Sequence, residues 1–400
     1  MAVIKAQVKR DLLVWARDRA KVSLEEAAKA AAVTVERIQR WEAGDDKPTI
    51  GQLRSLAEKY KFPLAVFYLP EPPLDFAPLR DFRRLPDEPE KTLSPHLAYH
   101  IRVAHERREL ALELLQDMGE KPLDLPLKVA IDDNPAAIGQ AIRDFLEIDQ
   151  TTQQKSAKQA FDFWRKRLEE HGVLVFVVSG PHRSVELSEM RGFAIAKAEL
   201  PTIVINGKDY SQGGKAFTLL HEFCHILLGE SAISNGTGDD PDLTPDERRI
   251  ERFCDAVAAA TLMPRDILMS FSEVADARRR EWSDEELRPI AQQLGVSREA
   301  LLLRLVSLER ATWAFYMGER QRFRQEYRQA ALERKKDNKP IPIKRPIMLM
   351  SWNGRGFTRL VLRSYYGQHI TLNDVAGYLG AKLKHIPPLE QAAFQPSNDL

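Results

Sequence analysis

The sequence His-Glu-Phe-Cys-His at residues 221–225 constrains this chain more than any other feature. The surrounding segment from Ala216 to Leu228 is apolar and follows two glycines, which predicts a helix. Positions i and i+4 lie on the same face of a helix, so His221 and His225 can bind one metal ion. Glu222 lies beside that face, where it can take a proton from a bound water. The motif therefore predicts a zinc site with Glu222 as the general base.

A second helix is predicted at about residues 245–262, and it supplies carboxylates for the same site. A catalytic zinc needs a third protein ligand and one open position for water. Glu251 follows the histidines by a few dozen residues and is the candidate third ligand. Asp255 lies one helical turn later, where it can hydrogen-bond a ligand histidine and orient it. Two alternatives stay open, which are an ordinary helix without metal and a zinc site without catalysis.

Three further side chains lie close in the sequence to the motif or to Glu251. Tyr210 precedes the predicted helix and is a weak candidate for stabilising an oxyanion. Cys224 and Cys254 are two thiols beside the predicted zinc site, where they could respond to oxidants. Packing as a small apolar side chain is the more common role of a free cysteine. We therefore expect both thiols to be buried packing residues.

Length and composition limit the class of the protein. A chain of 400 residues exceeds one ordinary core and predicts two to four domains. Lys+Arg (59) and Asp+Glu (58) nearly cancel, so nucleic-acid binding would need a local basic patch. Two cysteines cannot form a disulfide framework, which suits a reducing compartment. The first residues are too charged for a signal peptide, and no apolar run approaches a membrane helix of roughly 20 residues. We therefore expect a cytoplasmic protein.

Residues 23–44 (SLEEAAKAAAVTVERIQRWEAG) have the spacing of a helix-turn-helix. Ser23 and Thr34 are predicted to cap two short helices, and Gly44 is predicted to end the second one. Similar but less complete patterns occur at residues 287–305 and at residues 370–386. We expect residues 287–305 to pack structurally against the domain that holds the predicted zinc site.

The second helix of this pair is the candidate DNA-reading element. Bases are read by residues near the N-terminus of a recognition helix. Arg37, Gln39 and Arg40 have side chains able to contact DNA. Glu36 would bring negative charge to the DNA backbone, so a surface for docking another protein is the competing interpretation.

Together these segments resemble the ImmA/IrrE family of metallopeptidases. The resemblance is strongest in residues 192–231 (GFAIAKAELPTIVINGKDYSQGGKAFTLLHEFCHILLGES) and 250–264 (IERFCDAVAAATLMP). Members often pair a helix-turn-helix of the xenobiotic-response-element (XRE) type with a gluzincin-like site. The resemblance implies His221, His225 and Glu251 as zinc ligands and Glu222 as catalytic base. It also implies a partner helix-turn-helix repressor as substrate, cut once to relieve repression.

The predicted fold is mainly α with a small β-sheet (α+β). Apolar and β-branched runs predict strands at residues 173–178, 192–196 and 202–205. We predict five segments, which are an XRE-type helix-turn-helix domain (1–70), a Pro-rich linker and helix (71–128), a zinc metallopeptidase domain (129–268), a helical helix-turn-helix-like segment (269–332) and a C-terminal helical region (333–400). The charged, proline-containing run at 333–346 is predicted to be a connector.

Two functional hypotheses follow from these observations. The first is a zinc endopeptidase that cleaves a transcriptional repressor in response to stress. The second is an antitoxin or transcriptional regulator of a toxin–antitoxin module, which binds DNA or a cognate toxin and uses zinc for regulation or structure. The resemblance supports both hypotheses, and neither involves a membrane.

Overall fold

The computed structural model describes most of the chain, namely residues 5–73, 79–81, 93–178, 184–234, 243–275, 281–337 and 344–394. The chain forms two compact units, Met1–Pro78 with Pro86–Glu106, and Leu79–Leu85 with Arg107–Leu400. Three prolines of the predicted linker, Pro78, Pro86 and Pro89, lie outside the described residues. Within the described ranges, no helix combines the length and apolar character needed to cross a membrane. The subdivision of residues 129–400 stays a prediction.

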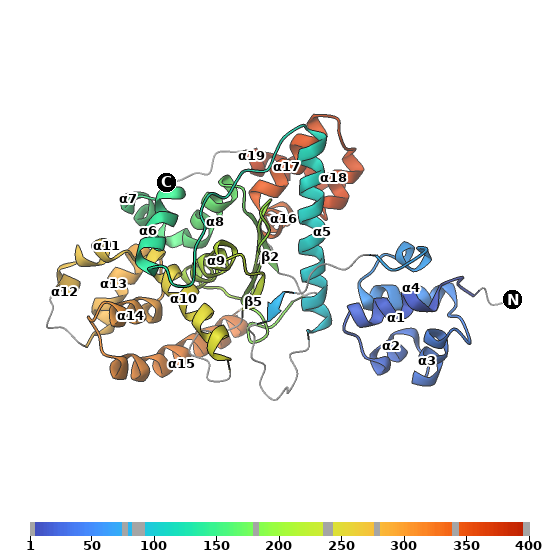
Figure 1. The fold of residues 1–400 in the computed structure, drawn as a ribbon, viewed down its shortest axis with the longest axis horizontal. Coiled ribbons are helices and arrows are strands. Elements are labelled where there is room, and N and C mark those ends of the chain that lie inside the picture. Colours follow the sequence, from blue (N-terminus) through green and yellow to red (C-terminus); the bar gives the residue numbers. More distant parts are fainter. Residues whose placement is uncertain are drawn as a thin grey trace. The chain divides into compact units, whose positions relative to one another are not determined.

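The first unit contains the predicted helix-turn-helix. Its helices are α1 (Arg10–Arg19), α2 (Leu24–Ala31), α3 (Val35–Ala43), α4 (Ile50–Tyr60), the short 3-10 helix η1 (Leu64–Tyr68) and the first half of α5 (Pro95–Asp117). Ile38 and Trp41 of α3 are buried in the core of this unit. The blue helices of Figure 1 are α1 to α4.

Local chemistry sets the limits of these helices. Ser23 begins α2 with a capping box, in which its hydroxyl accepts from the Glu26 amide and the Glu26 carboxylate accepts from the Ser23 amide. Gly44 ends α3 in the left-handed region with a φ of 87°, where other residues are strained. Thr34 is the N-cap residue of α3 as predicted, but its side chain makes no capping hydrogen bond.

The second unit is built on a five-stranded sheet in the order β1-β5-β3-β4-β2. The strands are β1 (Arg80–Asp81), β2 (Leu174–Val178), β3 (Gly192–Ile195), β4 (Thr202–Asn206) and β5 (Ala232–Ser234). β2 runs parallel to β4, β3 runs antiparallel to β4 and β5, and β1 runs parallel to β5. The three predicted strands are confirmed, and β1 and β5 were not predicted.

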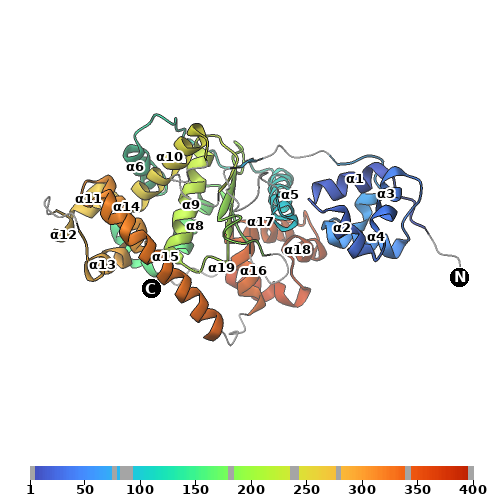
Figure 2. The same ribbon diagram turned by 90° about the horizontal axis from the view of Figure 1, so that it is seen from below.

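Helices cover both faces of this sheet. On one side lie α8 (Ala160–Glu170), α9 (Gln212–Leu227) and α10 (Pro245–Leu262), and on the other lie α16 (Arg345–Asn353) and α17 (Arg355–Tyr366) (Figure 1). Figure 2 shows the same division with the sheet seen edge-on. Phe176 of β2 packs on Phe357 of α17, with ring centroids 5.4 Å apart. The core between the sheet and α9 is the part of the fold that positions the site.

The remaining helices surround this core. They are α6 (Pro135–Phe145), α7 (Gln150–Lys155), the 3-10 helix η2 (Ala157–Gln159), α11 (Arg265–Met269), α12 (Ser272–Ala275), α13 (Asp284–Leu294), α14 (Arg298–Ser307), α15 (Trp313–Asp337), α18 (Leu372–Tyr378), the 3-10 helix η3 (Leu383–His385) and α19 (Ile386–Phe394). The prediction of a mainly α fold with a small β-sheet is confirmed.

One prediction about the C-terminal half is wrong in part. The connector predicted at residues 333–346 is helical at both ends, because α15 continues to Asp337 and α16 begins at Arg345. Residues 338–343 lie outside the described part of the chain. Charged residues such as Glu333 and Lys335 have good helix propensity, so a charged run alone does not end a helix.

Candidate metal centre

Helix α9 carries the HEFCH sequence through the core of the second unit. The helix begins where the Ser211 hydroxyl accepts a hydrogen bond from the Gly214 amide at 3.0 Å. Every residue from Leu219 to Leu227 is buried, so the helix is covered on all sides rather than on one stripe. A fully enclosed helix holds its side chains by close packing, which fixes the directions of His221 and His225.

Three candidate ligand atoms converge at the contact between α9 and α10. The Nε2 atoms of His221 and His225 are 3.1 Å apart. Glu251 of α10 places Oε2 at 3.4 Å from His221 Nε2 and Oε1 at 3.1 Å from His225 Nε2. Nitrogen and oxygen ligands of a tetrahedral zinc are separated by about 3.3 Å, given metal–ligand distances of ~2.0–2.1 Å. The three atoms therefore have the separations expected at three corners of a tetrahedral site.

Asp255 supports this cluster from one turn further along α10. Its Oδ1 lies 2.9 Å from Nδ1 of His221. A carboxylate at Nδ1 keeps the proton on that nitrogen and leaves the lone pair of Nε2 directed at the cluster. The structure thus brings together the four residues predicted as ligands and as the orienting group, and the group His221, His225 and Glu251 can hold a metal ion.

The electrostatics of the cluster favour a bound cation. Burial alone lowers the pKa of His221, but the Glu251 and Asp255 carboxylates outweigh it and hold that pKa well above the usual value. Burial raises the pKa of Glu251, yet the two imidazoles outweigh it and lower the pKa to about 2. Burial lowers the pKa of His225. An ionised carboxylate is the state that metal ligation requires, and a cation that binds here takes the place of the proton held by His221.

Glu222 is a buried carboxylate next to the candidate ligand His221. Its carboxylate is completely buried, and neither oxygen makes a hydrogen bond of ordinary geometry among the described residues. Burial raises the pKa of Glu222 to about 8, although the charge of His221 and the neighbouring Ser234 hydroxyl favour the ionised form and lower this pKa. A buried polar group without such hydrogen bonds indicates a functional role or an absent ligand, because the arrangement lowers stability. With its pKa near neutrality, this carboxylate can both accept and release a proton.

Gly192 makes room for this carboxylate, a role that was not predicted from the sequence. A Cβ at position 192 would lie 2.8 Å from Oε1 of Glu222 and 2.9 Å from Cγ2 of Thr218. Any larger residue at the start of β3 would push Glu222 out of place. The only available signal was a glycine at the start of an apolar run, which does not identify the side chain that approaches it.

The two cysteines and Tyr210 were the other residues singled out near the candidate ligands. Cys224 and Cys254 are free and fully buried in the main core of the unit, as expected for packing residues. Tyr210 lies two residues before α9, and its role as an oxyanion donor stays a prediction.

The candidate DNA-contacting residues lie on the surface of α3. Arg37, Gln39 and Arg40 are exposed, whereas Ile38 between them is buried. Arg37 forms an ion pair with Asp46, with its Nη2 3.0 Å from Oδ2. No local sequence pattern indicates this contact, because Asp46 lies beyond the end of α3. DNA contact by all three residues stays a prediction.

Comparisons with known proteins agree with this division of the chain. The peptidase M78 family model, described as an IrrE N-terminal-like domain, matches residues 168–306. A helix-turn-helix family model matches residues 13–67. No curated protein and no solved structure matched the chain. The chain therefore combines an XRE-type helix-turn-helix with a metallopeptidase-like domain of the IrrE type, which confirms the resemblance to the ImmA/IrrE metallopeptidases.

Proposed function

We propose that this protein is a zinc-dependent endopeptidase that regulates transcription by cleaving a partner repressor. The observation that carries the proposal is the spacing of the His221, His225 and Glu251 ligand atoms, beside the buried carboxylate of Glu222. Two histidines and one carboxylate are a ligand set of zinc peptidases. The match of residues 168–306 to an IrrE N-terminal-like domain supports the peptidase assignment.

The residues of the site have separate roles in this proposal. His221, His225 and Glu251 would hold the ion, which supplies Lewis acidity for activating water and polarising a carbonyl. Glu222 takes the water proton on a carboxylate oxygen and passes it to the leaving amine. Asp255 holds the His221 ring in position through Nδ1. Close burial of all these groups excludes bulk water and strengthens their electrostatic interactions.

A transcriptional role is supported by the helix-turn-helix in the same chain. Physical linkage to such a domain raises the local concentration of the peptidase near its regulatory target. A helix-turn-helix repressor is therefore the partner that we propose as substrate.

The proposal is tested by co-expressing the full chain with the products of neighbouring genes. We expect the wild type to cut one partner at a single site and Glu222→Gln to leave that partner intact. Glu285→Gln removes an exposed carboxylate on α13 and serves as the matched control, which should cut normally. Equal cleavage by Glu222→Gln and the wild type would refute the assignment of the base.

A second candidate function is supported by the surface of α3. Arg37, Gln39 and Arg40 are exposed on the recognition helix, so the chain could regulate transcription by binding DNA or a cognate toxin without cleavage. Under this alternative, the Glu222→Gln variant would still repress its operon or neutralise its partner. The co-expression experiment therefore separates the two functions.

A further inference from the structure

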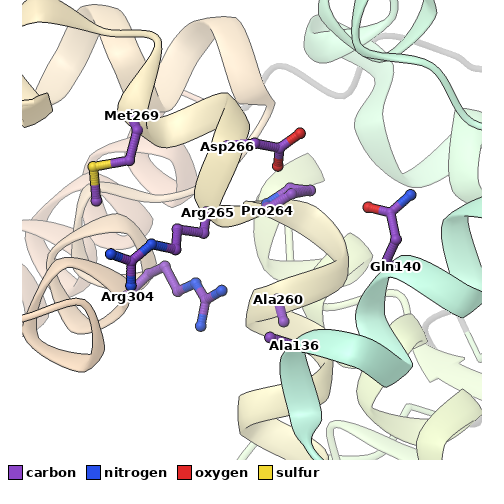
Figure 3. Close-up of a pocket in the computed structure, with 8 residues that line it drawn as sticks. All are labelled: Ala136, Gln140, Ala260, Pro264, Arg265, Asp266, Met269 and Arg304. Atoms are coloured by element: carbon purple, nitrogen blue, oxygen red, sulfur yellow. The ribbon is translucent and has the colours of Figure 1, made fainter.

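A pocket separate from the metal cluster lies where four helices of the second unit meet. Its volume is about 350 Å³. Residues of α6, α10, α11 and α14, together with Pro264, line it: Ala136, Gln140, Ala260, Pro264, Arg265, Asp266, Met269 and Arg304 (Figure 3). None of these residues belongs to the candidate metal centre. A volume near the lower end of the range for ligand pockets fits a small molecule rather than a polypeptide.

Arg304 is a buried cation in the wall of this pocket. The residue is only 7% exposed. Its Nε donates to the Met263 carbonyl at 3.1 Å and its Nη1 donates to the Ser307 hydroxyl at 3.3 Å. Among the described residues, no carboxylate pairs with this guanidinium. A buried charge without a counter-ion is destabilising, so the arrangement calls for an anion.

Arg265 adds a second positive charge to the same side of the pocket. Figure 3 shows the guanidinium groups of Arg265 and Arg304 together on one side, with Asp266 and Gln140 on the other. Burial, and then the neighbouring charge of Arg265, lower the pKa of Arg304. Arg265 also has no ion pair among the described residues. Two like charges on one side of a pocket, neither of them in an ion pair among the described residues, are stabilised when an anion enters it.

The opposite side of the pocket offers hydrogen-bond acceptors. Nε2 of Gln140 donates to Asp144 at 2.7 Å, which leaves its carbonyl oxygen available. The Asp266 carboxylate has no ion-pair partner within the described part of the chain. Ala260, Pro264 and Met269 provide the apolar surface between the two ends.

We propose that this pocket binds a small organic oxyanion, a carboxylate or a phosphate, that carries an amino group at its other end. The two guanidinium forks match the geometry of carboxylate and phosphate oxygens. The amino group of the ligand donates to Asp266 and to the Gln140 carbonyl. Carboxylate and phosphate share this recognition chemistry, and the experiment distinguishes them.

Calorimetry on the full chain tests the proposal with probes that differ in one group. γ-Aminobutyrate carries a carboxylate and an ammonium, phosphoethanolamine carries a phosphate and an ammonium, and ethanolamine lacks the anion. We expect one of the first two probes to bind at millimolar concentrations or below and ethanolamine not to bind. Tighter binding of phosphoethanolamine identifies a phosphate ligand, and tighter binding of γ-aminobutyrate identifies a carboxylate ligand.

Variants then locate the binding site. Arg265→Gln changes an exposed side chain, so the fold should persist and the affinity should fall by roughly 10-fold or more. Arg288→Gln removes an exposed arginine of α13 that does not line the pocket, and its affinity should be unchanged. Asp266→Asn should weaken the binding of phosphoethanolamine more than the binding of inorganic phosphate, because inorganic phosphate has no amino group. If neither γ-aminobutyrate nor phosphoethanolamine binds at ~10 mM, or if the wild type and Arg265→Gln bind equally, the proposal is overturned.

Discussion

Helices α9 and α3 carry the two candidate functions of this chain, and they differ most in burial. On α9, His221, Glu222 and His225 are at most 3% exposed. On α3, the candidate contact residues Arg37 and Arg40 are exposed. Buried functional groups must find their partners within the chain, so the structure identifies those partners. Exposed groups find theirs in another molecule, and the structure shows only which side chains are presented.

The second helix-turn-helix-like pair shows that sequence spacing alone does not decide whether such a helix is buried or exposed. Helices α13 and α14 repeat the pattern of α2 and α3, with Gly295 in the left-handed region and Ser297 as the N-cap. Leu301, Leu302 and Leu305 of α14 are nevertheless completely buried in the core of the second unit. The expectation that residues 287–305 pack structurally is confirmed, because these leucines belong to the main core of the unit.

The largest predicted effect comes from removing a candidate ligand on α9. His225→Ala leaves two ligand atoms and should abolish stoichiometric zinc, measured by metal analysis of the purified chain. Partner cleavage should fall by at least ~1,000-fold, because zinc and the base act as a unit. DNA binding through α3 should be unchanged, since the two helices belong to separate compact units. Retention of one zinc per chain would refute the ligand assignment.

Asp255→Asn is a milder test of the same buried site. The amide keeps the shape of the side chain but loses the charge that orients His221 through Nδ1. We expect zinc affinity to fall by roughly 10–100-fold, as for other groups that orient a metal ligand. Competition with a metal-binding dye measures this change. An affinity within twofold of the wild type would show that packing alone orients the imidazole.

The sequence predicted the buried region well because burial leaves a periodic pattern. Helix α10 was expected at about residues 245–262 and has these bounds, with Thr244 forming a capping box with Glu247. The helical i, i+4 spacing of the two histidines was enough to predict their shared face. Glu251 lies on the helix that the sequence predicted, and the structure shows it within 3.4 Å of both imidazoles.

Features that depend on distant pairing could not be predicted from the sequence. Strands β1 and β5 have two and three residues, and they are defined by the pairing of β1 with β5 and of β5 with β3. Such short segments lack a period that a sequence window can detect. The pocket with Arg304 combines residues from four helices far apart in the sequence, so no local pattern indicates it.

DNA binding by the exposed helix α3 is tested with a double variant that combines Arg37→Ala and Arg40→Ala. A duplex containing the region upstream of the gene is the probe, and we expect its affinity to fall by roughly 10-fold or more at low salt. The slope of log affinity against log salt should become shallower by about two, because two cationic contacts are lost. Arg288→Ala on α13 is the matched control and should change neither value. An unchanged affinity in the double variant would favour protein docking over DNA reading.

The smallest predicted effect concerns the ion pairs that hold α14 against its neighbours. Asp284 of α13 accepts from Arg322 of α15 at 3.0 and 3.1 Å and also pairs with Arg298 of α14. The hydrogen bonds from Arg322, and the charge of Arg298, lower the pKa of Asp284 to about 2 although burial opposes them. A carboxylate whose pKa is lowered by folding stabilises the folded state at pH values above its unfolded-state pKa of ~3.9. This contribution is lost as the pH falls towards ~2.

Asp284→Asn should therefore lower the free energy of unfolding of the second unit at pH 7 by at most ~1 kcal/mol, because the side chain is 28% exposed and partly screened by solvent. The difference between variant and wild type should shrink between pH ~4 and ~2. Denaturant unfolding at several pH values measures it, with Glu285→Gln on the same helix as the control. A constant difference across this range would show that Asp284 acts through packing. A difference that vanishes would show that α14 is held by charge as well as by its leucines.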